Sequence, residues 1–98
     1  MYGTVARMKV TPGHLDQLLD QMKDWDQRRR PDVKGAVASY VYRLDADANQ
    51  LMLAVVFSDK DAYFANADDP EQDKWFQELR AHLAEGPEWH DGEVIYST

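Results

Sequence analysis

The order in which the hydrophobic period changes along the chain constrains its fold most. Apolar residues follow strand and helix spacing in the order strand, helix, strand, strand, helix, strand. The third strand, residues 51–57, is apolar at every position. Such a run indicates burial on both faces, because a strand with one wet face alternates apolar and polar residues. Two helices cover only one face of a four-stranded sheet, so we expect the other face to meet a second copy of the chain.

Local signals predict where the elements begin and end. We expect Thr11 to cap the first helix, Pro12 to occupy its first position, and Pro31 to end it. The second helical region should begin at Ser58 and split at Asp69 and Pro70. Its stop signal is Gly86 followed by Pro87, with Trp75 and His82 on one stripe before it. The expected strands are 2–10, 35–44, 51–57 and 93–97, which together form an α+β, ferredoxin-like antiparallel sheet with two helices on one face.

Composition excludes several classes of protein. The 98 residues suffice for a single domain, 1–98, and no segment is long and apolar enough to span a membrane. A formal net charge of −7, from 18 acidic and 11 basic residues, disfavours nucleic acid as a partner. The absence of cysteine and of a charged leader at the N-terminus suits a cytoplasmic location. The arginines at 28–30 complement the dipole at the end of the first helix, an interpretation that we favour over an anion site.

No metal site or cofactor motif is predicted. The three histidines stand at 14, 82 and 90 without helical pairing, and phosphate-binding glycine loops and dinucleotide fingerprints are absent. His82 is a candidate base if its ring faces a cavity beside Trp75, or a solvated residue at the edge of the helix if it does not. We expect His14 to be solvated and His90 to fix a loop together with Asp91.

Several segments resemble the antibiotic-biosynthesis-monooxygenase-like domains of the dimeric α+β barrel superfamily. The likeness covers nearly the whole chain and is carried by Thr11-Pro12-Gly13, Tyr40-Val41-Tyr42-Arg43, the apolar run 51–57, Ser58-Asp59-Lys60-Asp61-Ala62-Tyr63 and Trp89-His90-Asp91-Gly92-Glu93-Val94. The resemblance implies a homodimer in which two sheets pack face to face as a barrel. It also implies a cavity between the helices and the sheet of each subunit.

The resemblance also suggests site residues. Monooxygenases of this superfamily that act on aromatic polyketides use an asparagine, a tryptophan, a tyrosine and an arginine. The matching residue types here are Asn66, Trp75, Tyr63 and Arg43, although Asn66 and Trp75 are further apart than in that pattern. Haem-degrading relatives use a histidine on the second helix, where this chain has His82, and an asparagine in the first strand, where it has Ala6 or Arg7.

These residues support one kind of chemistry better than others. A deprotonated electron-rich aromatic reacts with oxygen directly, so the protein need only orient the ring, exclude water and remove a proton. We therefore expect a monooxygenase that needs no cofactor, with Asn66 and His82 as catalytic residues. The substrate-binding candidates are Tyr63, Trp75, Arg43 and Tyr40.

Two other functions stay open. The same aromatic residues could simply form the core of a dimeric module that binds a small ligand or stabilises an assembly without catalysis. A protein that binds haem through His82 is the third possibility. An enclosed pocket lined by Asn66, His82 or Arg43 would favour the enzyme, and a filled core would favour the module.

Overall fold

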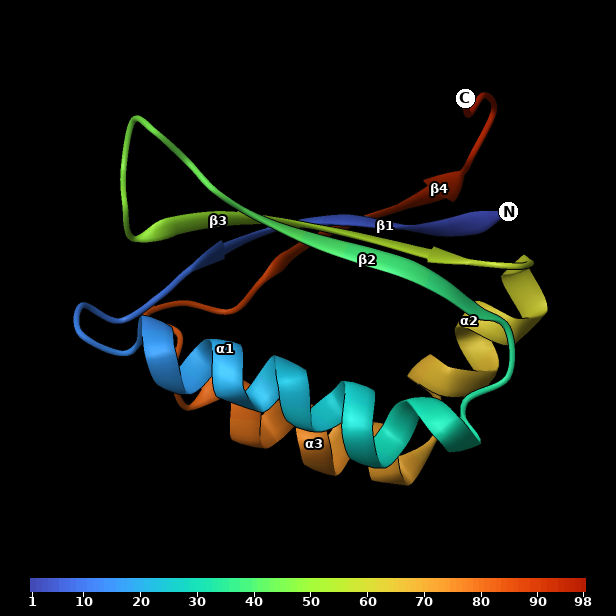
Figure 1. Cartoon of the computed structure of the whole chain (residues 1–98), viewed down its shortest axis with the longest axis horizontal. Helices are drawn as coiled ribbons and strands as arrows, with labels where there is room; N and C mark the ends of the chain where they lie inside the picture. Colours follow the sequence, from blue (N-terminus) through green and yellow to red (C-terminus); the bar gives the residue numbers. More distant parts are fainter.

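One four-stranded antiparallel sheet, covered by helices on one face, forms the whole domain (Figure 1). The computed structural model describes residues 1–98. The strand order is β2-β3-β1-β4, so the two halves of the chain interleave as expected for a ferredoxin-like fold. The elements are β1 (Tyr2–Lys9), α1 (Leu15–Asp24), β2 (Ala36–Arg43), β3 (Gln50–Phe57), α2 (Lys60–Ala67), α3 (Pro70–Arg80) and β4 (Glu88–Glu93). The predicted fold class is confirmed.

The strand pleat divides the sheet into a helix face and an open face. In β1, Thr4, Ala6 and Met8 are buried under the helices, whereas Val5 between them is 47% exposed. Strand β3 follows the same rule, because Leu51 pairs with Met8 and is also buried. Alternate residues of the apolar run 51–57 therefore lie on the helix face and on the open face. The core on the helix face consists of Met8, Val10, Leu18, Leu51 and Leu79.

The open face is largely apolar over β2 and β3, with charged residues toward one end of β1, and nothing in the chain covers it. Met52, Ala54 and Val56 of β3 lie on this face, beside Val5 of β1. Tyr40 and Tyr42 of β2 pair with Ala54 and Met52 and are each 61% exposed. Figure 1 shows all three α-helices on the opposite side of the sheet.

Two predicted helix starts are wrong. Thr11 does not cap α1; its carbonyl oxygen accepts a hydrogen bond from His14 N, and His14 occupies the cap position. The cap of α2 is Asp59, whose side chain accepts from Ala62 N, rather than Ser58. At α2 two adjacent residues, Ser58 and Asp59, can both serve as caps, and at α1 the cap position lies three residues after Thr11. The predicted cap Asp69 and the split at Pro70 are confirmed.

The last strand also lies elsewhere than predicted. It comprises Glu88–Glu93, not 93–97, and pairs antiparallel with β1 from Glu88 opposite Arg7 to Glu93 opposite Tyr2. Its sequence is polar because β4 is an edge strand with little to bury. Trp89 is the exception, and its ring packs at 5.8 Å from the ring of Phe76. The C-terminal residues Ile95 and Tyr96 are exposed.

A widened helical turn follows α1. Residues Trp25–Arg29 form a π-helical turn in which Arg30 N donates to Trp25 O, five residues earlier. A short 3₁₀ turn, Arg30–Asp32, then leads to β2. None of the helices is long and apolar enough to cross a lipid bilayer.

Candidate functional site

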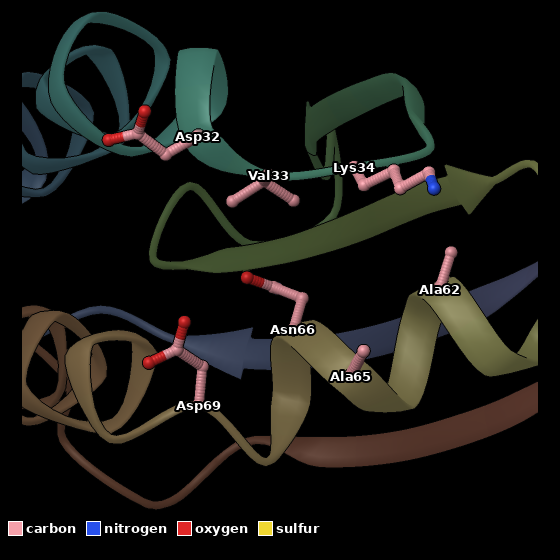
Figure 2. A pocket seen from close by; sticks show the side chains of 7 residues that line it. All are labelled: Asp32, Val33, Lys34, Ala62, Ala65, Asn66 and Asp69. Carbon is pink, nitrogen blue, oxygen red and sulfur yellow. The ribbon is translucent and has the colours of Figure 1, made fainter.

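A cleft of about 160 Å³ opens between α2 and the connection from the π turn to β2 (Figure 2). Asn66 lies in the middle of its α2 wall. Apolar contacts come from Val33, Ala62 and Ala65, and charged groups from Asp32, Lys34 and Asp69. Figure 2 shows the Asn66 side chain extending toward the end of the cleft where the carboxylates of Asp32 and Asp69 lie. The cleft combines an apolar wall with convergent polar groups, as ligand sites do.

Arg29 orients the Asn66 side chain. Its Nη2 donates to Asn66 Oδ1 at 3.1 Å, and the same nitrogen lies 3.5 Å from Asp69 Oδ2. Because the amide oxygen accepts from arginine, the NH₂ group of Asn66 is the part that remains to donate to a ligand. The other Asp69 oxygen, Oδ1, accepts from Glu71 N and so caps α3. The Asp69 carboxylate therefore caps α3 with one oxygen and pairs with Arg29 through the other.

Arg29 is unusually enclosed for an arginine. Its side chain is only 15% exposed, and its Nε is buried without a hydrogen-bond partner. Its neighbours Arg28 and Arg30 instead form exposed ion pairs with Asp24 and Asp26. A guanidinium removed from water near Asn66 exerts a stronger attraction on an anionic ligand than a solvated one does. The preference for a helix-dipole role fits Arg28 and Arg30, whereas Arg29 contributes to the cleft.

Tyr63 lies on α2 but points at the sheet. Its hydroxyl donates to Asp91 Oδ1 at 2.9 Å, and its ring contacts Tyr2, Phe57 and Phe64 at centroid distances of 5.1–5.6 Å. Burial, followed by the hydrogen bond to Asp91, raises the pKa of Tyr63 to about 12. The phenol therefore stays protonated near neutral pH. Tyr63 does not line the cleft of Asn66.

Trp75 packs between α1 and α3. Its Nε1 donates to the carbonyl oxygen of Gln21 at 3.0 Å, and its ring meets Trp25 edge to face at 6.4 Å. It also packs against the buried core cluster. These contacts make Trp75 part of the packing between the two helices, and it lies outside the lining of the cleft.

His82 lies far from Asn66. Helix α3 ends at Arg80, so His82 occupies the turn that follows, and its Nδ1 is 3.2 Å from Nδ1 of His14. Fifteen residues of nearly continuous helix separate His14 from Arg29, which is about 22 Å at the rise of an α-helix. Asn66 and His82 therefore do not form one site within a single chain. His14, expected to be solvated, is half-buried against His82.

The remaining two candidates also lie outside the cleft. Tyr40 is on the open face, so it cannot share a helix-side cavity with Tyr63; alternation along β2 places the two rings on opposite sides of the sheet. Arg43 ends β2 and is exposed. The cleft thus brings Asn66 together with Asp32, Lys34 and Asp69, none of which was predicted as a site residue, and Arg29 bonds Asn66 from beside it.

Comparison with known proteins identifies the family. The family model for antibiotic biosynthesis monooxygenase matches residues 1–78. A comparison with curated proteins finds no significant match.

Solved structures show the same fold at low sequence identity. A candidate antibiotic biosynthesis monooxygenase from Caulobacter crescentus is 14% identical with a TM-score of 0.83, over 97% of this chain and 90% of that one. SnoaB, a cofactor-independent oxygenase from Streptomyces nogalater, is 18% identical with a TM-score of 0.77, over 98% and 94%. A conserved protein from Methanosarcina mazei is 15% identical with a TM-score of 0.80, over 93% and 89%. At these identities the likeness shows the fold alone. Because the family model covers most of its length, this chain belongs to the antibiotic biosynthesis monooxygenase family.

Proposed function

We propose that this protein is a cofactor-independent monooxygenase that oxidises a small electron-rich aromatic in the cleft of Asn66. The observation that carries the proposal is the hydrogen bond from Arg29 to Asn66 Oδ1, which leaves the amide NH₂ available to a ligand. Membership of the family supports this class of reaction, and so does the oxygenase activity named for the structural relative SnoaB. The substrate class rests on the chemistry of the cleft.

The cleft provides groups for the two difficult parts of such a reaction. The Asn66 amide and the Arg29 charge stabilise the phenolate that forms when the substrate loses a proton. Asp32 lines the cleft and has no ion-pair partner, so its carboxylate is our candidate for accepting that proton. Val33, Ala62 and Ala65 supply apolar surface against the ring. A cleft of about 160 Å³ is small beside sites for drug-sized ligands, which favours one or two rings.

The bond changes balance without a cofactor. The deprotonated ring gives an electron to O₂, the resulting radicals combine, and the new C–O–O group takes a proton to become a hydroperoxide. Loss of water from a CH–OOH carbon then leaves a carbonyl, so that CH₂ and O₂ become C=O and H₂O. The protein contributes proton removal, charge stabilisation and orientation of the ring.

Oxygen consumption tests the proposal directly. Purified protein, stripped of metal and flavin, should consume O₂ with a hydroquinone of one or two rings. Asn66→Ala should lower the rate at least tenfold, about 1.4 kcal/mol in barrier, because the anion loses its donor. Asn49→Ala, in the turn between β2 and β3, is the matched control and should leave the rate unchanged. Equal rates in the wild type and Asn66→Ala would remove Asn66 from the mechanism.

His82→Ala separates two versions of the mechanism. Because His82 contacts His14, at the opposite end of the first helix from Arg29, we expect this variant to retain the wild-type rate of oxygen uptake. A tenfold loss would instead restore His82 as the base and would move the reaction to the other end of the domain.

One observation favours a binding module as the second candidate. The space between helices and sheet is filled around Met8, Leu18 and Leu79, so the cleft occupies only one end of the domain. Without oxygen uptake on any such substrate, a ligand-binding role for the same cleft is the better conclusion. A haem titration tests the third candidate, since haem ligated by His82 would lose its Soret shift in His82→Ala.

We also propose that the open face pairs with a second copy of the chain. The family resemblance implies two sheets packed face to face, and the apolar open face is the surface on which they would meet. A shallow hollow of about 130 Å³ lies on this face. Its lining includes Gly3, Val5, Ala54, Val56, His90 and Val94.

A further inference from the structure

Two histidines from distant parts of the sequence meet at the end of the domain away from the cleft. His14 caps the start of α1, and His82 lies in the turn after α3. Their Nδ1 atoms are 3.2 Å apart, their ring centroids are 5.5 Å apart, and their planes are inclined by 50°. The rings thus meet at their nitrogen corners rather than by stacking.

We propose that His14 and His82 form a binding site for a divalent first-row transition metal ion, with Zn²⁺ as the probe, each histidine binding through Nδ1. Zn²⁺ binds imidazole nitrogen at 2.0–2.1 Å, so two nitrogens on a tetrahedral ion lie about 3.3 Å apart. The observed separation of 3.2 Å already matches this geometry. The two rings can keep this separation and turn so that both lone pairs point at the ion.

The backbone holds both histidines in place through one residue. Thr11 O accepts a hydrogen bond from His14 N at 2.9 Å, and Thr11 N donates to His82 O at 3.0 Å. His82 N in turn donates to Leu79 O, and Val10 is bridged to Leu83. Ligands fixed in this way lose little freedom when an ion binds. Two flexible surface side chains, by contrast, would lose much more freedom on binding an ion.

The site has two protein ligands and leaves the other positions to water. No group of three or more histidine, cysteine or acidic side chains is arranged to hold a metal ion. Two imidazoles favour zinc, nickel and copper over the oxygen-seeking ions magnesium and calcium, with Cu²⁺ bound most tightly. The negative net charge of the chain attracts cations. The half-exposed rings leave a path for the ion.

Without metal, a single proton shared between the two Nδ1 atoms accounts for the contact. Binding requires a free lone pair on both Nδ1 atoms, so the shared proton moves to the Nε2 of its own ring. At lower pH, protonation of either imidazole competes with the ion and the affinity falls. The bound ion would link the start of α1 to the segment after α3. This site is independent of the proposed oxygenation, because it lies at the other end of the helical layer.

Calorimetric titration of the full chain with Zn²⁺ tests the site. At about pH 7.5 we expect one ion per chain, and at about pH 5.5 we expect binding to be lost. His14→Ala and His82→Ala should each weaken the affinity at least tenfold. His90→Ala is the matched control and should bind as the wild type does. It also tests the only rival, since His90 Nε2 lies 2.9 Å from Glu88 Oε1 on exposed β4.

A second measurement needs no variant and guards against misfolding. In nitrogen-detected NMR of the wild type, Zn²⁺ should shift the Nδ1 signals of His14 and His82 and leave those of His90 in place. The proposal is overturned if His14→Ala and His82→Ala bind Zn²⁺ as tightly as the wild type, if only His90 shifts, or if millimolar Zn²⁺ shifts no histidine.

Discussion

At the scale of single residues, Tyr63 has the most strongly shifted pKa. Its pKa is raised from 10.0 to about 12, first by burial and then by the hydrogen bond to Asp91. The folded protein therefore binds more protons than the unfolded chain between these two values. The contribution of the neutral phenol to the free energy of unfolding is fully present below about pH 10 and is lost as the pH rises through about 12.

Absorbance titration of the tyrosines measures this effect. Tyr63→Phe should abolish the ionisation step near pH 12 and should flatten the fall in thermal stability between about pH 10 and 12. Tyr96→Phe, at an exposed position, is the control and should leave both features in place. A Tyr63→Phe difference spectrum that titrates near pH 10 would show that burial does not hold the phenol neutral.

At the scale of elements, the close approach of β1 to β3 depends on Gly3. A Cβ at this position would lie 1.8 Å from the carbonyl oxygen of Val55, which belongs to the backbone and cannot turn aside. Gly3→Ala should therefore lower the free energy of unfolding by about 1–3 kcal/mol or more. Gly92→Ala, on the paired strand β4, meets nothing within 4 Å and should change it by no more than about 0.5 kcal/mol.

Urea unfolding of Gly3→Ala and Gly92→Ala measures how much each substitution lowers the free energy of unfolding. The comparison is informative because Gly3 and Gly92 face each other across one strand pair and lose the same backbone freedom. Equal midpoints for the two variants would mean that β1 and β3 can separate at little cost.

Element boundaries also show what local patterns can and cannot predict. The apolar stripe of α1 and the run of β3 are periodic, so sequence alone predicts them and their order. Strand β4 is missed because Glu88–Glu93 carries almost no apolar signal, and its pairing with β1 is what makes it a strand. Asn66 is a candidate through the family resemblance. Its partner Arg29 is not, because they are 37 residues apart and no periodicity relates them.

At the scale of the whole molecule, the apolar open face predicts a homodimer. Val56 lies on this face and Val55 on the helix face, so aspartate at the two positions should have different effects. Val56→Asp should give a folded monomer, since the charge prevents sheet-to-sheet packing but can reach water. Val55→Asp should unfold the domain, because the carboxylate is placed against the helices at a cost of several kcal/mol.

Sedimentation at micromolar concentration, with circular dichroism to report folding, distinguishes these outcomes. The wild type should sediment as a dimer through an interface of standard size, about 800 Å² per partner. A folded wild-type monomer, or a Val56→Asp variant that remains a dimer, would place the interface elsewhere or abolish it.

The π-helical turn of Trp25–Arg29 has a consequence for how this chain tolerates changes in length. A turn that closes at five residues instead of four holds one residue more than an α-helix would in the same rise. Deleting Gln27 should let this turn return to α-helical winding while the residues after it keep their positions, so Arg29 should still reach Asn66. A deletion within the regular winding of α1 has no such reserve: it would turn the guanidinium of Arg29 by about 100° about the helix axis and away from Asn66.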